Sequence, residues 1–320
     1  MNLDYIEETI SLGKDKLCFD YLDWNASYKG AERFYFDRCN KIEVIYREAL
    51  NEVKIKGSIP YFIKSHNYYS TIPEWIEGLE YIQGCLNINI FSGLIDKCEF
   101  GTIQEIQCKE SEFLSNHIKV KGMETRDFKK GNVITGKEFH SSSLKIKIYD
   151  VNRNIKNKLE KHIRDEISNL YGWDKEKHYI KIENHYKKPE AFFKGNLYLN
   201  ELLSNEYQKK CQIDLLNSYK SILKTGNIIL PSCKSDINAG TIPLMILKEL
   251  ESIYNFNTED LLRSKIKSIP IDILSPDDKK ARQRILRDNL NKIRLQGVSE
   301  YDITELLEAK IKNEEVLLYV

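Results

Sequence analysis

The stretch 133-VITGKEFHSSSLKIKIYD-150 ends in a run that alternates apolar and polar residues, which is the period of a β-strand. Successive side chains of a strand point to opposite faces. One face of this run carries Leu144, Ile146 and Ile148, and the other carries Lys145, Lys147 and Tyr149. We therefore expect a half-buried strand that holds Tyr149 on the same polar face as two lysines.

Other segments with strand character occur on both sides of this run. They are residues 86–93, 100–108, 117–124 and 178–186. Between the strands at 143–150 and 178–186, apolar residues recur at helical spacing over 152–173, at Ile155, Leu159, Ile163, Ile167 and Leu170. This order predicts strand, helix and strand around one shared sheet.

The pattern changes to helices near residue 197. Helical segments are expected at 197–226, 241–255, 257–268 and 276–297, with a loop at 231–240. We therefore predict an α+β protein of two domains. The first, residues 1–200, is built on an antiparallel sheet, and the second, residues 201–320, is mainly helical, with a winged helix as one form. Residues 1–75 are rich in aromatic side chains but show no motif.

The amino-acid composition argues against several classes of protein. The chain has 320 residues, of which 41% are hydrophobic, enough for a substantial core, and its 49 basic and 48 acidic residues nearly cancel. Its seven cysteines form no CxxC pair, which argues against a zinc finger and against a disulfide framework. No segment approaches the roughly 20 apolar residues that span a bilayer, and the N-terminus has no apolar core of a secretory signal. We expect a cytoplasmic protein with no membrane partner.

The polar faces of the predicted strands carry a set of residues with a chemical use. If Ile180 and Ile182 face the core, Lys181, Glu183 and His185 share the polar face, and the same parity places Glu105 there in the earlier strand. A tyrosine can attack a phosphodiester if its proton is removed and the phosphate charge is neutralised, for example by lysines and by carboxylates that hold Mg²⁺ or Mn²⁺. The alternative is that these are ordinary solvated strand positions, with Tyr149 selected for β-propensity.

Two short motifs in this region resemble those of a known family. The first is filled by Gly136, Ser143, Lys147, Ile148, Tyr149 and Asp150, and the second by Lys181, Ile182 and Glu183. They resemble the replication-initiation factors of rolling-circle plasmids, of the Rep_trans type, and the replication proteins of filamentous phages. The similarity covers roughly residues 80–195.

The resemblance implies an enzyme that nicks one DNA strand at a replication origin through a tyrosine, leaving a phosphotyrosine link and a free 3′-hydroxyl. Tyr149 would then be the nucleophile, assisted by Lys147 and Lys181. The implied metal ligands, for Mg²⁺ or Mn²⁺, are Glu105, Asp150 and Glu183, with His185 as a helper. Single- and double-stranded origin DNA, a host helicase and a host polymerase are the implied partners.

Val151 stands where the family shows a lysine after its Tyr-Asp pair, and this departure keeps a second interpretation open. In that interpretation the chain is a non-catalytic DNA-binding or regulatory protein on the same fold. None of the six histidines forms the His-hydrophobic-His pair of the better-known nicking enzymes, so a site of that kind is not expected.

Basic residues cluster in two places. Residues 119–161, which include Lys145, hold 12 Lys or Arg against 5 Asp or Glu, as a phosphate-binding surface requires. The predicted helix at 276–297 has an expected buried stripe of Ala281, Ile285, Leu286, Leu290 and Ile293. Its expected DNA-facing side chains are Lys280, Arg282, Arg284, Arg287 and Arg294. A charged face in contact with solvent alone is the alternative for both clusters.

Overall fold

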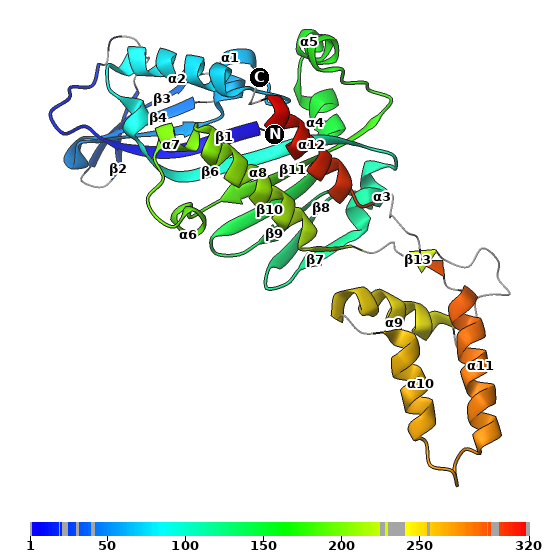
Figure 1. Ribbon diagram of the computed structural model, residues 1–320. Coiled ribbons are helices and arrows are strands. Elements are labelled where there is room, and N and C mark those ends of the chain that lie inside the picture. The colour runs from blue at the N-terminus through cyan, green and yellow to red at the C-terminus, as the bar shows by residue number, and fades with distance from the viewer. Residues whose placement is uncertain are drawn as a thin grey trace. The chain divides into compact units, whose positions relative to one another are not determined.

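The computed structural model describes residues 2–18, 20, 25–29, 32–39, 42–224, 228–229, 241–254, 257–292, 294–295 and 301–317. Its main element is an antiparallel sheet of ten strands in the order β2-β3-β4-β5-β1-β6-β11-β10-β9-β8 (Figure 1). The predicted α+β class is confirmed. No helix in these described ranges is long and apolar enough to cross a membrane.

The ten strands come from the first 186 residues of the chain. They are β1 (Asn2–Ser11), β2 (Asn25–Lys29), β3 (Glu32–Cys39), β4 (Ile42–Arg47), β5 (Glu52–Gly57), β6 (Leu94–Ile106), β8 (Glu124–Lys130), β9 (Val133–His140), β10 (Leu144–Asp150) and β11 (His178–Tyr186). Short strands outside this sheet form two separate pairs, β7 (His117–Val120) with β12 (Ile222–Lys224) and β13 (Ile228–Ile229) with β14 (Arg294–Leu295). Half of the large sheet therefore comes from residues 1–57, where the sequence showed no motif.

The helices follow and interrupt the strands. They are α1 (Ile59–Lys64), α2 (Ile72–Leu86), α3 (Glu110–Ser115), α4 (Val151–Lys158), α5 (Lys161–Tyr171), α6 (Glu190–Phe193), α7 (Leu199–Leu202), α8 (Asn205–Lys220), α9 (Thr241–Tyr254), α10 (Thr258–Ser268), α11 (Pro276–Lys292) and α12 (Thr304–Leu317), with 3₁₀ turns at Glu48–Leu50 and Ile90–Ser92.

The apolar face of β10 and β11 forms the centre of the core. Ile146, Ile148, Ile180 and Ile182 are each at most 1% exposed. Full burial of a side chain of this size contributes about 1.5–3 kcal/mol relative to exposure. This alternation fixes the register, because a slip of one residue in either strand would carry its two isoleucines to the opposite face.

Helix α8 covers that core face, whereas α4 and α5 cover the opposite one. Asn184 of β11 donates from Nδ2 to Ser218 Oγ of α8 at 2.8 Å and to Asp214 Oδ2 at 3.2 Å. The side chain of Tyr179, in the same strand, points to the opposite face of the sheet from Asn184. There it packs with the buried residues of α4 and α5. Helices α8 and α12 cross the sheet side by side in Figure 1.

Four predicted elements differ from the structure. The helix expected at 197–226 is divided into α7 and α8 and is followed by the short strand β12, and the helix expected at 276–297 ends at Lys292, before β14. The strand expected at 86–93 is absent, because Leu86 is the last residue of α2 and Ile90–Ser92 form a 3₁₀ turn. The chain then turns at Asn87, which adopts the left-handed conformation. The helix expected at 152–173 is divided into α4 and α5 by extended backbone at Leu159 and Glu160, so Leu170 is exposed instead of buried.

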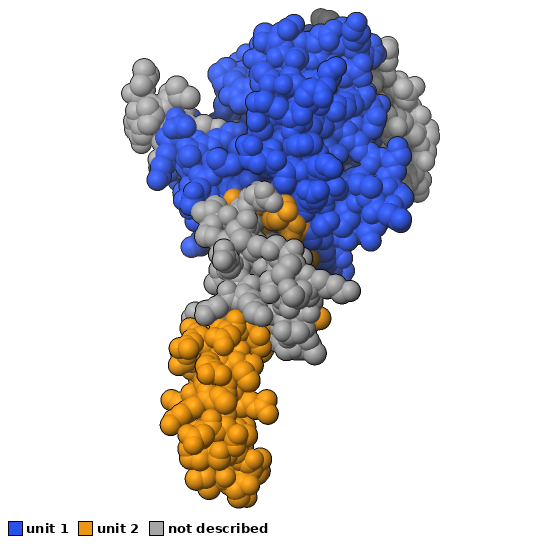
Figure 2. All heavy atoms as spheres, turned by 90° about the vertical axis from the view of Figure 1, so that its right-hand side faces the viewer, with its two compact units in different colours: residues 1–115, 119–222, 303–320 blue, residues 116–118, 223–302 orange. Residues whose placement is uncertain are grey.

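The chain divides into two compact units, coloured separately in Figure 2. Unit 1 comprises residues 1–115, 119–222 and 303–320, and unit 2 comprises residues 116–118 and 223–302. The division thus differs from the expected boundary at residues 200 and 201. The physical reason is that α8 packs on the sheet and α12 returns to it, where Lys310 Nζ donates to Thr102 Oγ1 of β6 at 2.8 Å.

Unit 2 is built on α9, α10 and α11, with β13 and β14 as a short two-stranded ribbon. Its small core is formed by Leu244, Leu286 and Leu290, with Leu262 and Ile266 packed against them. The expected loop at 231–240 lies outside the described residues.

Candidate functional site

The polar face of β10 and β11 brings the predicted catalytic side chains together. In the antiparallel register Tyr149 lies opposite Lys181, Lys147 opposite Glu183, and Lys145 opposite His185. Residues that pair across strands point to the same face. We call the group formed by Asp4, Glu99, Lys147, Tyr149, Lys181, Glu183 and His185 the sheet-face cluster.

Lys181 lies at the centre of this cluster and is 1% exposed. Its Nζ is 2.7 Å from Asp4 Oδ2 and 3.1 Å from Glu183 Oε1. A buried ammonium is costly without such partners. Burial alone would lower the pKa of Lys181, but the two carboxylates outweigh it and raise that pKa above its usual value.

Asp4 reaches Lys181 from β1, the strand that pairs with β6. The register of β1 shifts between Leu3 and Tyr5, and this irregularity is where Asp4 leaves the ladder. Gly101 of β6 leaves room for the approach, since a Cβ there would lie 2.8 Å from Glu183 Cγ and 3.2 Å from Asp4 Oδ2. Burial raises the pKa of Asp4 to about 8, because desolvation outweighs the attraction of Lys181.

Tyr149 is half-buried and donates its phenolic hydrogen to Glu183 Oε1 at 2.8 Å. Its backbone lies opposite Gly136 of β9, where a Cβ would come within 3.1 Å of Tyr149 Cβ. Burial, and then the negative charge of Glu183, raise the pKa of Tyr149 well above 10. At neutral pH the phenol is therefore protonated, and it loses its proton only if an acceptor takes it during the reaction.

A second ion-pair group adjoins Tyr149 on the same face. Lys147 Nζ is 3.2 Å from Glu99 Oε1 and 3.9 Å from Glu183 Oε2, and His185 Nδ1 is 2.7 Å from the same Glu99 oxygen. Although burial opposes it, the contacts with His185 and Lys147 lower the pKa of Glu99 to about 2. Further along, Lys145 pairs with Glu138 at 3.3 Å.

The four predicted metal ligands do not converge. Glu105 Oε2 accepts from Lys177 Nζ at 3.0 Å, and Asp150 caps α4 by accepting from the Arg153 backbone N–H at 2.9 Å. Glu183 Oε1 already contacts Lys181 Nζ and accepts from the Tyr149 hydroxyl, and His185 Nδ1 contacts Glu99 Oε1. No group of three or more His, Cys, Asp or Glu side chains suited to a metal occurs within the described ranges. The residues present therefore do not fit the Mg²⁺ or Mn²⁺ site that the sequence led us to expect.

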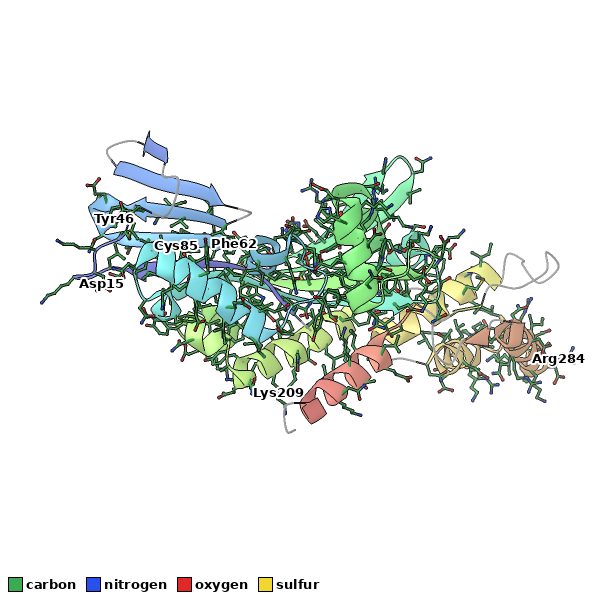
Figure 3. The ribbon with its side chains drawn as sticks, turned by 90° about the horizontal axis from the view of Figure 1, so that it is seen from above. Asp15, Tyr46, Phe62, Cys85, Lys209 and Arg284 are labelled. Atoms are coloured by element: carbon green, nitrogen blue, oxygen red, sulfur yellow. The ribbon has the colours of Figure 1, made fainter. Side chains whose placement is uncertain are left out.

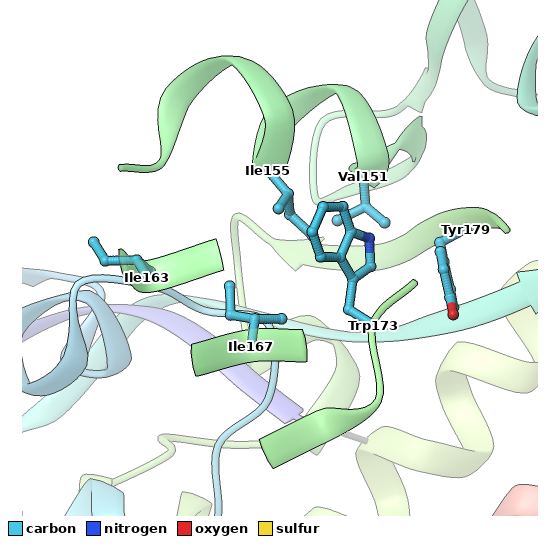
Figure 4. Close-up of a cluster of buried hydrophobic side chains, with 6 residues drawn as sticks. All are labelled: Val151, Ile155, Ile163, Ile167, Trp173 and Tyr179. Carbon is cyan, nitrogen blue, oxygen red and sulfur yellow. The ribbon is translucent and has the colours of Figure 1, made fainter. Parts of the chain in front are cut away.

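A cleft opens beside Tyr149 between α1, the 65–68 segment and α4. It encloses about 180 Å³, and Tyr61, His66, Asn67, Tyr68, Tyr149, Asn154 and Lys158 contribute to its walls. Its far wall is fixed by the buried cluster of Figure 4, in which Val151 and Ile155 of α4 pack with Ile163, Ile167 and Trp173. We call this the Tyr149 cleft.

The predicted DNA-facing residues of α11 are exposed. Lys280, Arg282, Arg284 and Arg287 all lie at the surface, and Arg284 is labelled in Figure 3. The expected buried stripe is only partly correct: Leu286 and Leu290 are buried, but Ala281 is exposed and Ile285 is 49% exposed, because α11 packs along one narrow line against α9 and α10. The side chains of Ile293 and Arg294 lie outside the described residues.

Asp4 and Glu99 belong to the cluster but were not predicted. Glu99 alternates with Cys98 and Phe100, both fully buried, so strand parity across 94–106 could have placed it on the polar face. Asp4 lies where the register of β1 shifts, so the alternation of side chains along the strand does not predict which face Asp4 occupies. The sequence offers no other indication of its position.

Comparison of the chain with models of protein families, with curated proteins and with solved structures found no match in any of the three.

Proposed function

We propose that the protein is a DNA-binding initiator of the rolling-circle type that cuts one strand through Tyr149. The observation that carries this proposal is the 2.8 Å hydrogen bond from the Tyr149 hydroxyl to Glu183 Oε1, beside a cleft that Tyr149 itself lines. A nucleophile within hydrogen-bond reach of a base that a third group orients is the usual arrangement for covalent catalysis, and here Lys181 orients Glu183.

In the proposed step the Tyr149 oxygen forms a bond to phosphorus while its proton passes to Glu183. The bond between phosphorus and the 3′-oxygen breaks, and that oxygen takes a proton from solvent to become a free 3′-hydroxyl. Because the pKa of Tyr149 is raised, loss of the proton before attack is unfavourable, and the proposed step transfers it to Glu183 as the bond to phosphorus forms. Lys147 and Lys181 supply positive charge on the same face.

A non-catalytic DNA-binding protein is the second candidate. The observation that favours it is the same raised pKa of Tyr149, together with the dispersal of the predicted metal ligands into separate ion pairs and a helix cap. In this alternative the sheet-face cluster stabilises the fold, and the basic surfaces alone contact DNA.

A covalent-adduct assay separates the two candidates. The protein is incubated with end-labelled single-stranded oligonucleotides of random sequence, in Mn²⁺ and separately in EDTA, and is then resolved under denaturing conditions. We expect a labelled protein band that Tyr149→Phe abolishes. Tyr81→Phe, a change at a tyrosine on α2 that is 63% exposed, is the control and should keep the band. If the wild-type protein gives no band under either condition, the catalytic proposal fails and the binding-only candidate remains.

A further inference from the structure

A second pocket, rich in tyrosine, lies in unit 1 next to the Tyr149 cleft. It encloses about 250 Å³, and its walls include Tyr68, Tyr69, Glu105, Tyr171, Tyr179 and Lys310. Tyr68 lines both this pocket and the Tyr149 cleft. The two hollows are therefore neighbours that share one aromatic wall. We call the second one the tyrosine pocket.

Aromatic rings gather around Tyr171 at one side of the pocket. The ring centroids of Tyr69 and Tyr68 lie 5.6 Å and 6.0 Å from that of Tyr171. Lys64 fixes the Tyr171 ring, since its Nζ donates to the Tyr171 hydroxyl at 3.2 Å and also lies 5.4 Å from the ring centroid. Tyr69 is nevertheless 40% exposed, so aromatic surface remains open to a ligand with a flat ring.

Polar groups occupy other parts of the wall. Lys310 Nζ donates to Thr102 Oγ1 at 2.8 Å and to the Ile103 carbonyl at 3.1 Å. Glu105 supplies carboxylate oxygens, one of which accepts from Lys177. The pocket thus combines ring surfaces with both donors and acceptors, which suits a planar ligand that has a polar edge.

His66 adds an unused donor at the boundary between the two hollows. It is 1% exposed, lines the Tyr149 cleft and meets the Tyr171 ring edge-on at 5.8 Å. Its Nδ1 accepts from the Tyr68 backbone N–H at 3.3 Å, which places the ring proton on Nε2. Within the described residues Nε2 has no hydrogen-bond partner, because Glu166 Oε1 is 4.0 Å away. A buried donor of this kind is costly unless a ligand uses it.

From this arrangement we infer that the tyrosine pocket holds one unstacked nucleobase of a single-stranded DNA whose adjacent phosphate lies in the Tyr149 cleft. The inference rests on the proposed function for its choice of ligand. Stacking on aromatic rings is how proteins hold unpaired bases, and it tolerates any base because each has a π-face. His66 Nε2 then donates to an oxygen of the strand as it passes from one hollow to the next.

Binding of dye-labelled oligo(dT) tests the inference without any cleavage step. Loss of one stacked base corresponds to a weakening of about 5- to 150-fold. We expect Tyr69→Ala to raise the Kd by a factor in this range, Tyr69→Phe to leave it close to wild type, and Tyr81→Ala, outside the pocket, to leave it unchanged. Binding of a duplex of the same length should be equal in all four proteins. An excess of dTMP distinguishes a pocket for free nucleotides, which dTMP would occupy, from one that requires a strand.

Photo-crosslinking gives an independent readout on the wild-type protein. Oligo(dT) carrying 5-bromodeoxyuridine at single positions should crosslink to peptides that contain Tyr69 or Tyr171. If Tyr69→Ala binds like wild type and the crosslinks map elsewhere, the inference is overturned even where the covalent adduct forms. If the adduct fails but binding and crosslinking behave as expected, only the cleavage proposal falls. Absence of single-strand binding by the wild-type protein would reject both.

Discussion

Among single residues, Lys181 contacts two buried acidic side chains, Asp4 and Glu183, and supplies the positive charge beside both. Asp4 and Glu183 are 2% and 3% exposed, and each has an oxygen within 3.1 Å of Lys181 Nζ. Removal of one member of a buried ion pair leaves the others uncompensated, which typically costs about 3–5 kcal/mol. The orientation of Glu183, and with it the hydrogen bond of Tyr149, therefore depends on a positive charge at position 181.

We accordingly expect Lys181→Met to lower the free energy of unfolding by about 3–5 kcal/mol, as measured by urea denaturation. Lys145→Met is the matched control, because Lys145 is a more exposed lysine on the same face and its ion pair with Glu138 should contribute within about 1 kcal/mol. Equal effects of the two substitutions would show that Lys181 is not the electrostatic centre of the cluster.

Asp4 makes the stability depend on pH. Its pKa is raised from 3.8 to about 8. Between these values the folded protein binds more protons at Asp4 than the unfolded chain does, so the free energy of unfolding falls as the pH rises through this window. One such group contributes a slope of at most about 1.4 kcal/mol per pH unit.

Asp4→Asn removes this titration and should flatten the decline in stability between about pH 4 and pH 8. Unfolding free energies measured across this range test the expectation. Asp15→Asn, at the exposed aspartate labelled in Figure 3, is the control and should retain the wild-type slope. Superimposable curves for Asp4→Asn and wild type would contradict the assignment.

At the scale of elements, the junction of β10 and α4 positions the Tyr149 cleft. Tyr149 is followed by Asp150, whose side chain caps α4, and α4 then supplies Asn154 and Lys158 to the cleft. Loss of such a cap costs about 1 kcal/mol, whereas asparagine caps as well as aspartate. The structure thus gives Asp150 a role at a helix terminus, which differs from the metal ligation predicted for it.

The pair Asp150→Asn and Asp150→Ala separates these two roles. If Asp150 is a cap, the Asn variant should keep wild-type stability and adduct formation, while the Ala variant should lose about 1 kcal/mol of unfolding free energy. Thermal or urea unfolding, followed by the adduct assay, gives both readouts. Loss of the adduct in the stable Asn variant would indicate that the carboxylate charge itself is needed.

The same elements show what the sequence could predict. Alternation in 144–150 and 178–186 was sufficient to place Tyr149, Lys181 and Glu183 on one face, because parity within a strand is a local property. Which side chains then pair is not local. Glu105 lies on the predicted face but forms an ion pair with Lys177, and Asp4 arrives from a strand about 180 residues away in sequence. The periodicity of the sequence predicts which face of a strand a side chain occupies. Which other side chains it contacts depends on the order of the strands in the sheet and on irregularities in their register.

At the scale of the whole molecule, the helices of unit 2 are inserted in the sequence between two helices of unit 1. The Tyr219 hydroxyl of α8 accepts from the Ile303 backbone N–H just before α12, at 3.2 Å, so the chain leaves unit 1 and returns to it at nearly the same place. Helical periodicity predicted α9 to α11, but no local signal showed that residues after 302 rejoin the sheet. Exposed basic side chains lie on α11 of unit 2, and we propose that they contact DNA phosphates.

Substitution of Arg282, Arg284 and Arg287 by alanine should weaken duplex binding and lower the slope of log affinity against log salt by about 0.9 for each DNA phosphate that is no longer neutralised. Titrations at several salt concentrations measure both quantities. Lys209, Lys210 and Lys220, exposed lysines of α8, provide a charge-matched triple variant that should keep the wild-type slope. Identical slopes for wild type and the arginine variant would place duplex binding elsewhere.

The proposed cleavage requires that the Tyr149 oxygen become bonded to DNA. The most direct measurement is mass spectrometry of the denatured, nuclease-trimmed and trypsin-digested adduct. Cleavage after Lys147 and Arg153 releases Tyr149 in the peptide 148-IYDVNR-153. We predict that this peptide carries the mass of a residual nucleotide on its tyrosine, and that the Lys181→Met protein gives far less of it. A nucleotide on another tyrosine, such as Tyr171, Tyr179 or Tyr186, or the absence of any modified peptide, would show that Tyr149 is not the nucleophile.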